Sequence, residues 1–232
     1  MTVARAVAVA VALFGVTAVA FGDERVSASP DAGRGAFLDI ARVLQSPRCM
    51  NCHPTGDAPL QGERSQPHAM NITRASVEAG LVCATCHQER NSEAIGVAGG
   101  PPGAPHWGLP AKEMPLVFQS KTPSELCEQL KDPERNGHKD AQALLEHVDH
   151  DPLVLWGWHP GGKRTLPPLS HDAFVTAWKT WTSAGRVCPT PCPSWRCRGV
   201  CTMKGRDVLR PSTLVRRLER RRGSLDAMEP RA

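Results

Sequence analysis

The sequence predicts a mainly α-helical domain with long irregular loops and little or no β structure. Four segments carry apolar residues at the three- and four-residue spacing of an amphipathic helix, and several begin at a good N-cap residue. The 21 Pro and 20 Gly among the 232 residues predict extensive loops between these helices. Alternating apolar and polar residues, the mark of a strand, are weak throughout the chain.

The N-terminus has the pattern of a secretory signal peptide. One positive charge, Arg5, precedes an uncharged run from Ala6 to Gly22, and Ala18-Val19-Ala20 resembles a cleavage site. We therefore expect residues 1–20 to be a signal peptide and residues 21–30 a linker, with the mature protein outside the cytoplasm. An uncleaved membrane anchor is the alternative, because the run approaches the length that spans a bilayer.

The first helix of the domain is expected over residues 29–47, with Pro47 as its end. A short helical piece is expected at residues 74–79, between loops rich in Pro and Gly. The apolar stripe of the first helix consists of Phe37, Ile40, Ala41 and Leu44.

Three more helices are expected in the second half of the chain. "TPSELCEQLKDP" has Thr122 as N-cap and Glu125 three residues later, which is a capping box. "KDAQALLEHVDHD" carries its apolar residues on one face, and "SHDAFVTAWKTWTSAG" begins at Ser170 and stops at Gly185. Between these two, "DPLVLWGWHPGGKRTLPP" is expected to be extended and irregular.

The C-terminal tail, residues 190–232, differs in composition from the domain at residues 31–189. From Pro189 to Ala232 there are ten Arg and one Lys against two Asp and two Glu. Such a segment, with few large apolar residues, is expected to be disordered or only locally helical. Since the rest of the chain is close to neutral, the net charge of +5 does not indicate a nucleic-acid partner.

Two Cys-x-x-Cys-His units dominate the chemistry of the chain. Four thiols could bind one structural zinc ion, but the two histidines would then have no part in the site. A redox dithiol needs no histidine either, and it usually lies in a thioredoxin-like βαβ unit that is not expected here. Covalent attachment of haem uses all six residues. The units are Cys49, Cys52 and His53, and Cys83, Cys86 and His87.

Cys-x-x-Cys-His is the attachment signature of c-type haem, in which both thiols bond the porphyrin and the histidine binds the iron. Such haems are attached outside the cytoplasm, which agrees with the signal peptide. We therefore expect two covalently bound haem c groups, with the helices and loops wrapped around them. Their proximal iron ligands are expected to be His53 and His87.

The ligand on the other side of each iron is expected to be a Met or a His. "QPHAMNI" offers His68 or Met70, which are two residues apart, so only one of them can face a given haem. "HWGLPAKEMPL" offers His106 or Met114, and Met114 lies in a loop near Pro residues on both sides. We expect His68 and Met114 to be the distal ligands.

Other residues have structural interpretations. Cys127 and Cys188 fall on helices predicted to pack, and an oxidising compartment favours a disulfide between them. His147 lies one position off the apolar face of its helix, whereas most other histidines are expected to be solvated. Five tryptophans are expected to pack on haem faces: Trp107, Trp156, Trp158, Trp178 and Trp181.

Over residues 48–189 the chain resembles the small dihaem c-type cytochromes known as isoquinoline 1-oxidoreductase subunits. They occur beside periplasmic molybdenum hydroxylases in proteobacteria. The matching stretches include "RCMNCHPTGDAPLQG", "CATCHQERN", "PGAPHWGLP", "LCEQLKDPERNG", "EHVDHDPLVLWGW" and "AWKTWTSAGRVCP". The resemblance implies a periplasmic haem protein that accepts electrons from a redox protein such as a hydroxylase. The family ends near Cys188-Pro189, so the tail departs from it and is expected to lie outside the functional domain.

Electron transfer therefore fits the sequence better than catalysis, because two fixed haems form a two-centre conduit. The alternative is a small dihaem oxidoreductase, peroxidase-like or oxidising sulfur compounds, with one open haem site. Glu113, Glu146 and Asp149 are available as acid–base groups, but no paired arrangement distinguishes them. Membrane contact is expected only through an uncleaved signal peptide.

Overall fold

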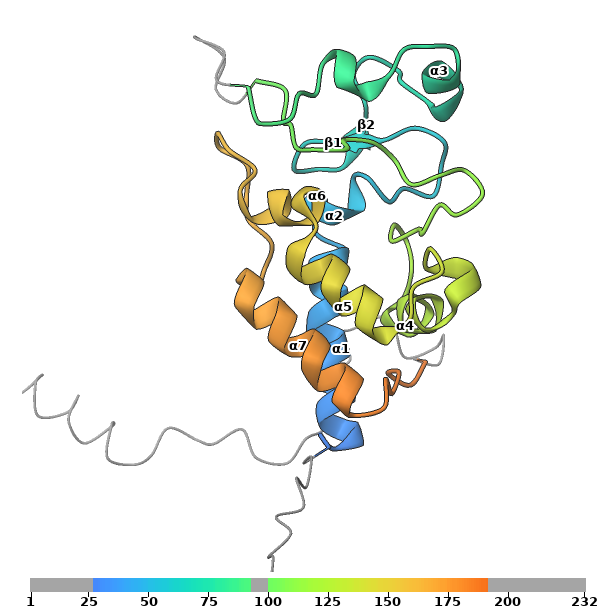
Figure 1. Cartoon of the computed structure of the whole chain (residues 1–232), viewed down its shortest axis with the longest axis vertical. Helices are drawn as coiled ribbons and strands as arrows, with labels where there is room; N and C mark the ends of the chain where they lie inside the picture. The colour runs from blue at the N-terminus through green and yellow to red at the C-terminus, as the bar shows by residue number, and fades with distance from the viewer. Residues whose placement is uncertain (1–26, 93–99, 192–232) are drawn as a thin grey trace, which may run out of the picture. The chain divides into compact units, whose positions relative to one another are not determined.

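The computed structural model describes residues 27–92 and 100–191 (Figure 1). The chain divides into two compact units, Met1–Pro189 and Thr190–Ala232. Nearly all of the described residues belong to the first unit. The expected signal peptide and almost all of the Arg-rich tail lie outside the described residues, so the structure gives no account of either.

The described part of the chain is mainly helical, as the sequence predicts. Its β structure is one antiparallel pair of two-residue strands, β1 (Leu60–Gln61) and β2 (Gln66–Pro67). Within residues 27–92 and 100–191, no helix combines the length and apolar character needed to cross a membrane. The helices are α1 (Pro30–Leu44), α2 (Pro47–Met50), α3 (Arg74–Glu78), α4 (Pro123–Lys131), α5 (Ala141–His150), α6 (Pro152–Leu155) and α7 (His171–Ser183), with 3-10 turns η1 (Cys83–Thr85), η2 (Pro133–Arg135) and η3 (Trp156–Trp158).

The hydrophobic core lies where α1 and α7 run side by side (Figure 1). The predicted stripe of α1 is fully buried there, and the Phe37 ring lies 4.9 Å from that of Trp181. The two helices approach closely at Gly33, where an added Cβ would lie 2.5 Å from the Cβ of Ala184. A glycine at this position therefore sets the distance between the helices.

Helix ends follow the local signals in most places. Thr122 and Glu125 form the expected capping box at the start of α4, and Ser170 caps α7. The expected end of the first helix is wrong, because α1 stops at Leu44 and Pro47 instead opens α2. Ser46 before that proline is extended, and proline is well suited to a first helical position.

The segment after α5 was expected to be irregular but begins with α6 and η3. Asp151 caps α6, and its carboxylate accepts hydrogen bonds from the amides of Leu153 and Val154. Pro152 occupies the first helical position. Asp-Pro is therefore a start signal here, and this short helical run carries Trp156 toward the second Cys-x-x-Cys-His unit.

Trp178 and Trp181 do not have the surroundings expected for residues on haem faces. Their exposed fractions are 1% and 0%, and the protein itself covers them. The two rings meet edge to face at 5.3 Å, and Trp178 also contacts Phe174. Since no surface is left for a further group, these residues belong to the α1–α7 core. Trp158 likewise packs on Phe174, with ring centroids 5.3 Å apart.

A disulfide joins Cys127 and Cys188, the pair expected from the sequence. Cys127 is buried on α4, but Cys188 lies beyond the end of α7 rather than on a helix. The bond ties the segment after α7 back to α4, 61 residues earlier in the chain. It therefore fixes the last part of the unit that ends at Pro189.

Candidate haem-binding site

The first Cys-x-x-Cys-His unit is anchored by its own histidine. The Nδ1 atom of His53 lies 2.7 Å from the carbonyl oxygen of Leu116, and a carbonyl can only accept. His53 Nδ1 therefore carries the proton, which leaves the Nε2 lone pair for a metal. The His53 ring also stacks on Phe118 at 4.0 Å, and the His53 carbonyl accepts a 2.9 Å bond from the Phe118 amide.

The carbonyl that fixes His53 is held by unusual backbone. Leu116 has a φ of 43°, a left-handed conformation that a branched residue adopts at a cost of about 1–2 kcal/mol. It lies between Pro115 and Val117, in the loop that passes over the first unit. Such strain persists only where the surroundings enforce it, and here it directs an acceptor at a candidate iron ligand.

The second unit repeats the arrangement with different residues. His87 Nδ1 donates to the carbonyl oxygen of Pro102 at 2.7 Å, so His87 Nε2 is again left for a metal. Trp107 stacks on the His87 ring at 4.8 Å with an interplanar angle of 8°. Trp156 packs edge-on against Trp107 at 4.7 Å. Each motif histidine thus has a carbonyl at Nδ1 and an aromatic ring on one face.

Asn91 connects the second unit to the rest of the domain. Its Oδ1 accepts from the Gly103 amide at 3.1 Å and from Trp156 Nε1 at 2.8 Å, and its Nδ2 donates to the His159 carbonyl at 2.9 Å. Gly103 follows Pro102 and passes so close to the second unit that a Cβ would lie 2.3 Å from the carbonyl oxygens of Gln88 and Arg90. Only glycine fits in this position.

All four motif thiols are free, as thioether attachment requires. Burial raises the pKa of Cys49 to about 12 and that of Cys52 to about 11, so both remain protonated near neutral pH. Negative charge on Cys83 would raise the pKa of Cys52 further. In the described part of the chain, no three His, Cys, Asp or Glu side chains come together to hold a metal ion.

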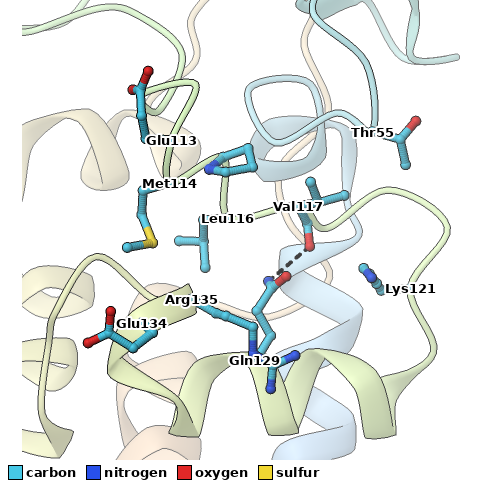
Figure 2. A pocket seen from close by; sticks show the side chains of 10 residues that line it. Thr55, Glu113, Met114, Leu116, Val117, Lys121, Gln129, Glu134 and Arg135 are labelled. Carbon is cyan, nitrogen blue, oxygen red and sulfur yellow. Dashed lines mark hydrogen bonds between the residues drawn. The ribbon is translucent and has the colours of Figure 1, made fainter.

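The structure places one of the two expected distal ligands, His68, beside a motif histidine. The ring centroid of His68 lies 6.1 Å from that of His87. Met114 lies in a groove of about 390 Å³, where its side chain extends toward Glu134 and Arg135 on the α4 side (Figure 2). Two residues after Met114, the Leu116 carbonyl of the same loop accepts the hydrogen bond from His53 Nδ1.

Of the remaining histidines, His147 and His171 are partly buried and the others are exposed. His147, singled out on α5, pairs its Nδ1 with Asp151 at 3.3 Å, and a proton on His147 would lower the pKa of His53. Burial is the main reason that the pKa of His53 is lowered to about 4. His171 is bonded to the Val148 carbonyl, while His106, His138, His150 and His159 are exposed.

Buried Arg48 and partly buried Arg74 border the site, and sequence reasoning missed both. The Arg48 side chain is 3% exposed and pairs with Glu63 at 2.7 Å, but its Nε has no partner. Arg74 donates to the carbonyls of Pro110 and Gly56, while its buried Nη2 also lacks a partner. Orphaned guanidinium N–H groups are costly unless an acceptor arrives. An anionic group bound beside these side chains on α2 and α3 would supply one, although no sequence pattern marks either residue.

Comparisons of the whole chain with protein-family models, curated proteins and solved structures find no match. The functional assignment therefore depends on the residues of the site. Its chemically distinctive parts are four free thiols, two oriented imidazoles and two buried guanidinium groups.

Proposed function

We propose that this chain is a periplasmic dihaem c-type cytochrome that transfers electrons between redox proteins. The observation that carries the proposal is the repeated state of the motif histidines. In both units Nδ1 donates to a backbone carbonyl at 2.7 Å, so that Nε2 is the free nitrogen beside two free thiols. A hydrogen bond at the far ring nitrogen is the usual support for a metal-ligating histidine.

The residues fit haem c in three further respects. The thiols of each unit are unbonded and lie one helical turn apart, at i and i+3. Phe118 and Trp107 cover one face of each imidazole and fix its orientation. Arg48 and Arg74 provide buried positive charge with unsatisfied N–H groups, which suits the propionate carboxylates of haem.

Bound haem supplies reversible one-electron chemistry. The protein sets the reduction potential of each haem through the basicity of the imidazole ligand and through burial. Donation from Nδ1 to the Leu116 and Pro102 carbonyls makes both imidazoles stronger ligands.

The partner and the compartment are proposed on other grounds. Export follows from the signal-peptide pattern at residues 1–20. The proposed electron donor is a dehydrogenase or molybdenum hydroxylase, on the basis of the resemblance over residues 48–189, with onward transfer toward the respiratory chain.

The proposal is tested by combining a redox titration with reactivity assays on the haem-loaded protein. We expect two one-electron steps and rapid reduction by a small electron donor. We also expect no carbon monoxide binding by the ferrous protein and no consumption of peroxide or thiosulfate. A protein that binds carbon monoxide at one haem and turns over peroxide or a sulfur compound would be an enzyme, and the electron-transfer assignment would then fail.

A further inference from the structure

We propose that His68 is the second axial ligand of the iron bound by His87, so that this centre has two imidazole ligands. The inference rests on the proposed function, because it presupposes a haem at the second unit. It assigns a partner to one particular histidine, which the sequence alone does not do. It also removes Met114 from this centre.

The spacing of the two rings matches what a single iron requires. Their centroids are 6.1 Å apart, with an interplanar angle of 64°. An imidazole nitrogen lies about 2.0 Å from a bound metal ion, and the ring centre is about 1 Å farther, so two imidazoles on opposite sides of one ion have centroids roughly 6 Å apart. Edge-to-face ring pairs in direct contact cover the range of about 4.5–7 Å as well. The observed separation matches the span of two imidazoles on one iron, and the variants described below distinguish ligation from a plain ring contact.

His68 is held in this place by the backbone around it. Its amide donates to the Pro59 carbonyl at 3.1 Å, and its own carbonyl accepts from the Asn71 amide at 2.9 Å. Asn71 has a φ of 50°, a left-handed turn conformation that asparagine tolerates well. The turn starts directly after β2, so the short sheet and the turn together position His68 before any metal binds.

The competing sulfur ligands point elsewhere. Met70 is 70% exposed, although it lies only two residues from His68. Met114 lines the groove of Figure 2 with Leu116 and Gln129, close to the first unit. Of the two residues that "QPHAMNI" offers, the histidine is therefore the one turned toward His87.

Ligation requires one change in hydrogen bonding. His68 Nδ1 now accepts a 3.3 Å bond from the Met70 amide, so the ring proton is on Nε2. Iron binding at Nε2 moves that proton to Nδ1 and breaks this long bond. The Met70 side chain and its neighbours are exposed, so water can accept from the freed amide at little cost.

The test compares His68→Ala with Met70→Ala and Met114→Ala in the haem-loaded protein. In His68→Ala we expect one of the two haems to become high-spin in the ferric state and to bind carbon monoxide when reduced. Met70→Ala should keep the wild-type spectra, and Met114→Ala should leave the haem at His87 low-spin. Electron paramagnetic resonance and carbon monoxide titration report the change independently of activity.

His68→Met is the second variant, for the case in which His68→Ala fails to load haem. It should add the far-red charge-transfer band of a thioether–iron bond at one centre. Two haems that stay low-spin in His68→Ala, or opening of the His87 haem by Met114→Ala instead, would overturn the assignment. Wild-type protein without two covalent haems would instead refute the proposed function itself, so the two failures are distinguishable.

Discussion

Replacing Gly103 with alanine should disturb the haem centre proposed at the second Cys-x-x-Cys-His unit without changing its ligands. The new Cβ would lie 2.3 Å from the carbonyl oxygens of Gln88 and Arg90, so the 100–103 backbone must move. This movement displaces the Pro102 carbonyl from His87 Nδ1 and weakens the bond between the Gly103 amide and Asn91. Overpacking costs about 1–3 kcal/mol and the lost hydrogen bond about 1 kcal/mol.

We therefore expect Gly103→Ala to lower the unfolding free energy of the haem-loaded protein by roughly 2–4 kcal/mol in urea titrations. The reduction potential of one haem should also rise, because an imidazole without a carbonyl acceptor donates less charge to ferric iron. Gly108→Ala is the matched control, since its Cβ meets only the His106 carbonyl at an ordinary 3.8 Å. If both variants behave alike, the Pro102 carbonyl does not support His87 in the way described.

Three further outcomes follow from the structure. Gly33→Ala should lower the unfolding free energy by about 1–3 kcal/mol, because its Cβ would lie 2.5 Å from the Cβ of Ala184. The control is Gly35→Ala on the same helix, whose Cβ meets nothing within 4 Å and which should raise the unfolding free energy by about 0.5–1 kcal/mol. Equal effects of the two variants in urea titrations would contradict the packing of α1 on α7. Reduction of the Cys127–Cys188 disulfide, or its replacement by two alanines, should cost about 4 kcal/mol, since it closes a loop of 61 residues, and an unchanged melting temperature would count against it. In the chain produced without haem, burial lowers the pKa of folded His53 to about 4 from 6.5, so the unfolded state binds the proton more readily. The contribution of His53 to the unfolding free energy should therefore be fully present above pH 6.5 and fall by about 2–3 kcal/mol as the pH drops to 4. His53→Gln should flatten that part of the profile of urea midpoint against pH.

The parts of the fold that the sequence predicts are those governed by local signals. The apolar stripe containing Phe37 and the capping box at Thr122 each depend on residues within one or two helical turns, and both occur as expected. The errors arise where tertiary context decides. The sequence predicts that Pro47 ends a helix, but Pro47 begins α2. Trp181 is predicted to pack on haem, but α1 packs against it and leaves it fully buried.

The candidate site divides in the same way. Both Cys-x-x-Cys-His units are visible in the sequence because their chemistry depends on fixed spacing. The groups that orient the motif histidines cannot be read from the sequence. The Leu116 carbonyl accepts from His53, 63 residues earlier in the chain, and the strained φ at Leu116 has no sequence signature. Likewise, Arg48 on α2 is buried beside residues more than 100 positions away, such as Trp156 and Gly157, which no local pattern reveals.

The central claim is that each Cys-x-x-Cys-His unit holds one covalent haem, and counting haems tests it most directly. The chain should be exported by a bacterial host with cytochrome c maturation machinery, and its haem content measured by the pyridine haemochrome assay and intact mass. We expect two covalent haems per chain, and one when Cys83 and Cys86 are both replaced by serine. A chain that carries no covalent haem, or that binds zinc through free thiols instead, would contradict the account.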